Sequence, residues 1–109
     1  YKEILFQETR IKTDYVDQTN LNSINKLYQK IGSNFDLIID DGLHASYANI
    51  NVIISSLNYL KKGGFLVIED IPFKTITIWE VVNCILNNKY ETLFIKAKKS
   101  LVFIVKKIN

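Results

Sequence analysis

The sequence has 109 residues, a formal net charge of +3 and 48% hydrophobic residues. This length allows one domain at most, and the apolar content is ample for a packed core and excludes a disordered composition. The lysines are scattered rather than gathered in a basic stripe, which argues against a nucleic-acid partner. No apolar stretch reaches the ~18 residues of a membrane span. The single cysteine, Cys84, excludes an intrachain disulfide and, with no visible signal peptide, favours a cytoplasmic setting.

The chain contains no methionine and begins Tyr1-Lys2-Glu3, so we expect it to be a segment of a longer protein. Its opening, Tyr1 to Glu8, is amphipathic without a clear element. The first expected element is a strand over Arg10 to Val16, where apolar and polar residues alternate. A helix follows, with an N-cap at Thr19 or Asn20 and a stop at Gly32.

The middle of the chain contains two short apolar runs separated by a helix. The first run, Phe35 to Asp40, is rich in β-branched residues and has the pattern of a strand buried on both faces. A helix is expected over Ser46 to Leu60, ended by Gly63-Gly64. The second run predicts a strand over Phe65 to Glu69.

The last third of the sequence predicts one helix and a hairpin. The helix runs from about Thr75 to Asn88 and places Cys84 among apolar neighbours, where we expect it to be buried. Two closing strands, Tyr90 to Ala97 and Ser100 to Lys107, have so short a link that they must be antiparallel neighbours. The order strand, helix, strand, helix, strand, helix and antiparallel pair predicts an α/β fold with a mostly parallel sheet.

Acidic residues end both apolar runs. Asp40-Asp41 close the first run, Glu69-Asp70 close the second, and the only histidine, His44, follows the first pair. The carboxyl ends of neighbouring parallel strands open onto one crevice, so these side chains are expected to converge there. Carboxylate oxygens suit magnesium better than zinc. An acid after the first run could instead cap the next helix, an alternative that the spacing leaves open.

Three stretches together resemble class I S-adenosylmethionine-dependent methyltransferases. They are Val16-Asp17-Gln18-Thr19, Asp40-Asp41-Gly42-Leu43-His44 and Gly63-Gly64-Phe65-Leu66-Val67-Ile68-Glu69-Asp70. More narrowly, they are similar to the metal-dependent branch that contains macrocin O-methyltransferases and the proteins called cephalosporin hydroxylases. The resemblance implies a Rossmann-like methyltransferase sheet, mostly parallel with a C-terminal antiparallel hairpin. Residues 1–109 would be the C-terminal part of a single methyltransferase domain, lacking its first two strands.

The resemblance also implies roles for individual residues. Asp17 would contact the adenine of S-adenosylmethionine, with Gln18 beside it, and Asp40 would lie near the methionine end of the cofactor. The ligands of a divalent metal, Mg²⁺ or Mn²⁺, would be Asp41, Glu69 and Asp70, and His44 would be the general base. One residue departs from the motif: Leu43 stands where the family usually has Ser or Thr.

These residues favour a segment of a metal-dependent O-methyltransferase that acts on a hydroxyl of a sugar or other small molecule. Nothing in the sequence has the spacing of the family's Gly-x-Gly cofactor loop, so we expect the isolated chain to be inactive. Three alternatives stay open: the same fold assisting another metal-dependent reaction, a non-catalytic fragment or interaction domain, and a receiver-like magnesium-binding domain. The last is disfavoured because the acid pairs end adjacent strands. We expect neither a nucleic-acid nor a membrane partner, and a homo-oligomer stays open.

Overall fold

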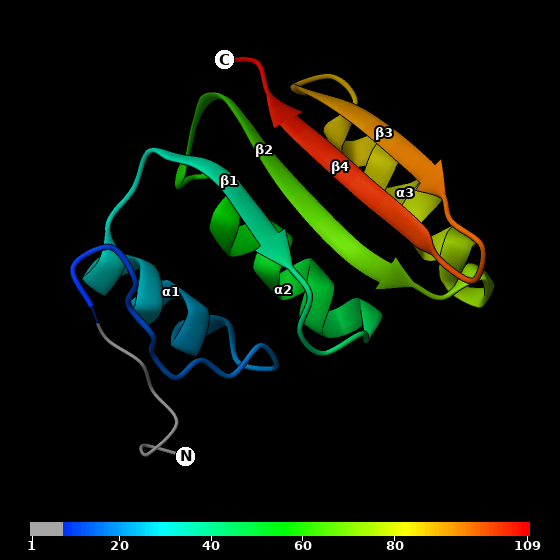
Figure 1. Cartoon of the computed structure of the whole chain (residues 1–109). Coiled ribbons are helices and arrows are strands. Elements are labelled where there is room, and N and C mark those ends of the chain that lie inside the picture. Colours follow the sequence, from blue (N-terminus) through cyan, green and yellow to red (C-terminus); the bar gives the residue numbers. More distant parts are fainter. Residues whose placement is uncertain (1–7) are drawn as a thin grey trace.

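The computed structural model describes residues 8–109, and the expected opening therefore lies outside the described residues except for Glu8. The described part is an α/β fold with three α-helices and a four-stranded mixed sheet (Figure 1). In chain order the elements are α1 (Leu21–Ile31), β1 (Phe35–Asp40), α2 (Ser46–Ser56), β2 (Leu60–Ile71), the 3-10 helix η2 (Phe73–Thr75), α3 (Ile76–Leu86), β3 (Tyr90–Lys96) and β4 (Leu101–Lys107).

The strand order in the sheet is β1-β2-β4-β3. Strands β1 and β2 are parallel, with Ile39 opposite Val67, as the helix between the two apolar runs predicts. Strand β4 returns antiparallel between β2 and β3, and Phe94 of β3 lies opposite Phe103 of β4. The expected closing hairpin is thereby confirmed.

The two faces of the sheet differ in their cover. Helices α2 and α3 both lie behind the sheet in Figure 1, and α1 lies beyond the edge formed by β1. We call the face toward α2 and α3 the covered face; its fully buried residues include Leu66, Ile68, Phe103 and Val105. Side chains alternate along a strand, so the opposite, open face carries the exposed apolar residues Leu37, Ile39, Phe65, Leu93 and Ile95.

The expectation that the first apolar run is buried on both faces is wrong for β1. Leu37 is 52% exposed and Ile39 is 53% exposed, whereas Ile38 on the other face packs against the core. Among residues 8–109, β1 pairs with β2 alone, and the two apolar side chains on its open face stay about half exposed to solvent. A run of apolar residues therefore indicates a strand but does not say what packs on it.

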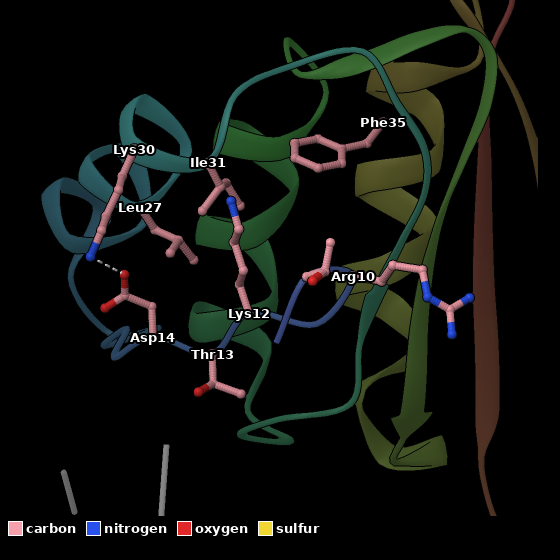
Figure 2. Close-up of a pocket in the computed structure, with 9 residues that line it drawn as sticks. Arg10, Lys12, Thr13, Asp14, Leu27, Lys30, Ile31 and Phe35 are labelled. Carbon is pink, nitrogen blue, oxygen red and sulfur yellow. Dashed lines mark ion pairs between the residues drawn. The ribbon is translucent and has the colours of Figure 1, made fainter. Parts of the chain in front are cut away.

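The expected strand over Arg10 to Val16 is also wrong: these residues form no helix or strand and join no sheet. They run alongside α1, and the carboxylate of Asp14 pairs with Lys30 of that helix at 2.5 Å (Figure 2). The pair and the backbone N–H of Tyr15 lower the pKa of Asp14. A strand needs a partner for its backbone groups, and alternation alone does not supply one.

The Gly63-Gly64 pair does not end a helix as expected. Helix α2 ends at Ser56, and β2 begins at Leu60 and continues through both glycines. Gly63 has a φ of +82°, and a Cβ on Gly64 would lie 2.8 Å from the carbonyl oxygen of Phe35. The two glycines therefore allow the irregular first part of β2 to lie close to the start of β1.

Helix α3 presents a second mismatch with the sequence. Trp79 is completely buried, but Cys84 is exposed and Ile85 is 71% exposed, so the expectation of a buried cysteine is wrong. Cys84 follows Trp79 by five positions, which is about 140° around a helix. Only one side of α3 contacts the sheet, so its apolar residues cannot all be buried. In the described part of the chain, no helix is long and apolar enough to cross a membrane.

Candidate metal site

The turn between β1 and α2 carries the first two residues of the site. Asp41 directly follows β1, and His44 lies three positions later, just before α2 begins. Helix α2 has Ala45 as its N-cap and no side-chain cap hydrogen bond. The alternative in which Asp40 or Asp41 caps this helix is therefore wrong, and the carboxylate of Asp41 is left free to face outward.

Asp70 enters the site through an irregularity in β2. The regular pairing with β4 is interrupted between Ile68 and Ile71, and Asp70 has a φ of +54°, in the left-handed region. Consecutive residues of a regular strand point to opposite faces, so this break gives Asp70 a direction that the regular strand would not. The hydroxyl of Ser100 donates a long hydrogen bond to Asp70 at 3.4 Å.

Asp41, His44 and Asp70 come together at the carboxyl ends of β1 and β2. One ligand atom from each lies within 4.8 Å of the other two. The imidazole Nε2 of His44 lies 3.9 Å from Asp41 Oδ1 and 3.7 Å from Asp70 Oδ2. All three side chains are open to solvent, which leaves room for water ligands. Two carboxylates and an imidazole at this separation fit a divalent cation such as Mg²⁺ or Mn²⁺.

Glu69, the third expected metal ligand, is not part of this group of three. It is half-buried and follows Phe65 and Val67 on the open face of β2. Its role as a ligand stays a prediction, as do the other individual site roles.

Asp40 lies under the site rather than in it. It is 3% exposed, and both of its carboxylate oxygens accept hydrogen bonds. Gln18 Nε2 donates to Oδ1 at 2.6 Å, and Asn49 Nδ2 of α2 donates to Oδ2 at 2.8 Å. The sequence reasoning missed Asn49. Its signal is a polar residue amid the apolar residues of α2, and it is itself 3% exposed.

Asp17 lies in an exposed turn before α1. Its carboxylate accepts hydrogen bonds from the side chain and the backbone N–H of Thr19, at 2.6 and 2.9 Å. These bonds, the side-chain one first, lower the pKa of Asp17, so the carboxylate is charged at neutral pH. The free oxygen of such a residue can accept a hydrogen bond from a ligand.

A pocket of about 540 Å³ lies beside Phe35, at the start of β1 and away from the acids that follow this strand. It is lined by α1, by Phe35 and by five residues before α1, namely Thr9, Arg10, Lys12, Thr13 and Asp14 (Figure 2). A smaller pocket of about 270 Å³ lies between α1 and β1 and reaches from Phe35 to Asp40 and Gln18. Of these two pockets, only the smaller one reaches Asp40 at the end of β1, next to the metal site.

No protein-family model matches the sequence, and no curated protein matches it. Solved structures do match the fold. The chain is similar to the MycE methyltransferase from the mycinamycin biosynthetic pathway in complex with Mg and SAH, with a TM-score of 0.72 and 19% identity over 94% of this chain and 33% of that chain. For the same enzyme with Mg, SAH and mycinamycin VI, the TM-score is 0.70 with 20% identity, again over 94% and 33% of the two chains.

A second crystal form of MycE with Mg and SAH matches with a TM-score of 0.68 and 18% identity, over 94% of this chain and 34% of that chain. The chain therefore spans about a third of the length of the structures it matches. At this level of identity the likeness shows the fold alone: the described residues share the α/β fold of about a third of the MycE chain.

Proposed function

We propose that the chain is the metal-binding part of an S-adenosylmethionine-dependent O-methyltransferase, and that its acceptor is a hydroxyl of a small molecule. One observation carries the proposal: Asp41, His44 and Asp70 lie within 4.8 Å of one another on a fold shared with a methyltransferase. The MycE structures contain Mg and SAH, and one also contains mycinamycin VI. These ligands support the choice of metal, cofactor and acceptor class for this chain. The same proposal includes a Rossmann-like strand order in the whole domain and a cytoplasmic setting.

The residues of the chain suit different parts of this chemistry. Asp41 and Asp70, joined by Glu69, would hold the cation through their oxygens. A bound divalent cation makes a coordinated hydroxyl more acidic and orients it. His44, beside both aspartates, is placed to accept the hydroxyl proton at Nε2. Asp17, charged and exposed before α1, would accept a hydrogen bond from adenine, with Gln18 and Asp40 on the path between adenine and the metal.

A titration of the 109-residue chain with Mn²⁺ or Mg²⁺, followed by calorimetry, tests the metal site. We expect one bound cation per chain, and a loss of affinity of more than about tenfold for Asp41→Asn and Asp70→Asn. Glu91→Gln, which removes an exposed carboxylate of β3, is the control and should bind normally. Equal affinity in all four proteins would contradict the proposed site. The same titration of Glu69→Gln decides whether Glu69 is a ligand.

His44→Ala separates a base from a ligand. If His44 is the base, its replacement leaves cation affinity near that of the unsubstituted chain, because oxygen ligands hold the metal. A loss as large as that of Asp70→Asn would instead make His44 a ligand and remove it as the proton acceptor.

A non-catalytic domain with this fold is the second candidate function. The observation that favours it is the open apolar face of the sheet, which suits contact with another protein surface. Titration with S-adenosylmethionine, followed by calorimetry, distinguishes the two candidates when it is done on a longer protein that includes this chain. Binding there supports the transferase, and absence of binding supports the second candidate.

A further inference from the structure

The turn that carries Asp41 and His44 is held by hydrogen bonds from two other parts of the chain. The anchor is Asp40, whose carboxylate is buried between Gln18 on one side and Asn49 on the other. The backbone N–H of Gly42 also donates to Asp40 Oδ1, at 3.3 Å. With both oxygens engaged, Asp40 is not available to a cation in the neighbouring site.

Gln18 reaches further along the same turn. Its Oε1 accepts a hydrogen bond of 2.6 Å from the backbone N–H of Leu43, while its Nε2 binds Asp40. This orientation of the amide is the one that chemistry requires, because the carboxylate needs a donor and the N–H needs an acceptor. A Cβ on Gly42 would lie 2.3 Å from Gln18 Oε1, so only glycine leaves space for this contact.

The side-chain amides of Asn49 and Asn51 hold the turn from the side of α2. We call Gln18, Asp40, Asn49 and Asn51 together the clasp. Asn49 Nδ2 also lies 3.5 Å from the carbonyl oxygen of Leu43, so both backbone groups of Leu43 face clasp residues. Asn51 Nδ2 donates to the backbone carbonyl of Gln18 at 3.0 Å and ties the segment before α1 to α2. The residue that follows Leu43 is His44.

We infer that Gln18 and Asn49 are positioning residues for the cation site, acting through Asp40 and the backbone of the Asp41–His44 turn. The inference rests on the proposed function for the existence of the site. Its physical basis is that exposed ligands bind a metal tightly only when their backbone is held in place beforehand. The side chains of Asp41, a proposed ligand, and of His44, the proposed base, are 59% and 41% exposed, so the hydrogen bonds underneath supply the order of the turn that carries them.

Gln18→Ala tests the inference with the least risk to folding, because Gln18 is only half-buried whereas Asn49 is fully buried. We expect its Mn²⁺ affinity, measured by calorimetry on the 109-residue chain, to fall by about 10–100-fold. Asn83→Ala removes a half-buried amide that accepts a hydrogen bond from Thr92, on α3 away from the site, and is the matched control. Its affinity should stay within about twofold of the unsubstituted chain.

Gln18→Glu separates positioning from simple proximity. If Gln18 only lay near the cation, the added negative charge would strengthen cation binding. In the clasp the new carboxylate faces Asp40 and cannot donate to it, so we expect binding to weaken instead. Tighter binding by Gln18→Glu would overturn the inference.

The single histidine supplies a readout without any metal. We expect the proton NMR signal of the His44 imidazole to shift or broaden in Gln18→Ala and to stay unchanged in Asn83→Ala. An unchanged signal together with unchanged Mn²⁺ affinity in Gln18→Ala would overturn the positioning role while leaving the proposed function intact. If the unsubstituted chain binds no cation, the proposed function and this inference both fail.

Discussion

Leu66 on the covered face of the sheet is completely buried, whereas Leu93 on the open face keeps 56% of its surface exposed. Both lie in the middle of strands rich in apolar residues, and in the sequence the two positions look alike. The difference is that α2 and α3 pack on one face only (Figure 1). The sequence sets how apolar a face is, but the neighbouring elements set how much that face contributes to stability.

The largest expected effect contrasts these two leucines directly. Leu66→Ala removes buried methyl groups and leaves a cavity, so we expect it to lower the free energy of unfolding by about 2–5 kcal/mol. Leu93→Ala makes the same chemical change on the open face and should alter it by no more than about 0.5 kcal/mol. Urea unfolding followed by circular dichroism measures both. Equal losses would show that the open face is covered in solution.

A smaller effect concerns the polar part of the core beside the covered face. The hydroxyls of Tyr28 and Ser56 share a buried hydrogen bond of 2.6 Å, which joins α1 to α2. Tyr28→Phe leaves the Ser56 hydroxyl unpaired and should cost about 1–2 kcal/mol. Tyr47→Phe is the control, because Tyr47 is 60% exposed.

The same pair of variants gives a pH dependence. Burial raises the pKa of Tyr28 above its ordinary value of 10.0, with the nearby Asp40 and Tyr59 adding to the shift and the bond to Ser56 opposing it. A raised pKa means that the folded state holds the proton more strongly than the unfolded state. The contribution of Tyr28 is therefore complete below about pH 10 and is lost as the pH rises through the folded-state pKa. Tyr28→Phe should lack this loss, and a parallel decline in both proteins would contradict the assignment.

The smallest expected change in stability comes from a substitution that places a charge on the open face. Leu93→Lys should leave the free energy of unfolding nearly unchanged, because the side chain stays in water. It should, however, reduce the binding of a hydrophobic dye and any self-association, measured by sedimentation velocity, because it interrupts the apolar surface. If neither changes, the open face is not the surface through which the chain associates.

The sequence predicted the elements better than their surroundings. The apolar runs and their separation by a helix predicted the parallel pair β1 and β2, and the short polar turn predicted the hairpin of β3 and β4. The alternation of apolar and polar residues in 10–16 led to a wrong strand prediction, because strand pairing depends on a neighbouring strand that a local pattern cannot reveal. The exposure of Cys84 depends likewise on which side of α3 meets the sheet.

For the site, the sequence predicted that Asp40, Asp41, Glu69, Asp70 and His44 would converge. Among the described residues, Asp41, His44 and Asp70 do lie together, because strand ends and spacing determine that much, whereas Asp40 and Glu69 lie outside that group of three. It could not predict the hydrogen bonds beneath them. Gln18 and Asn49 are 31 positions apart, and their meeting on Asp40 follows from the packing of the segment before α1 against α2. Long-range polar contacts of this kind have no local signature.

The left-handed backbone of Asp70 restricts which residues evolution and protein engineering can place there. At a φ of +54°, asparagine, aspartate and glycine are tolerated far better than other residues, and β-branched ones worst. The metal-ligand role that we propose for Asp70 calls for a charged carboxylate at the same position. Aspartate alone satisfies both demands, so exchange for glutamate, conservative in charge, would be unfavourable for the backbone. Asparagine keeps the conformation and removes only the charge, which makes it the informative substitution at this position.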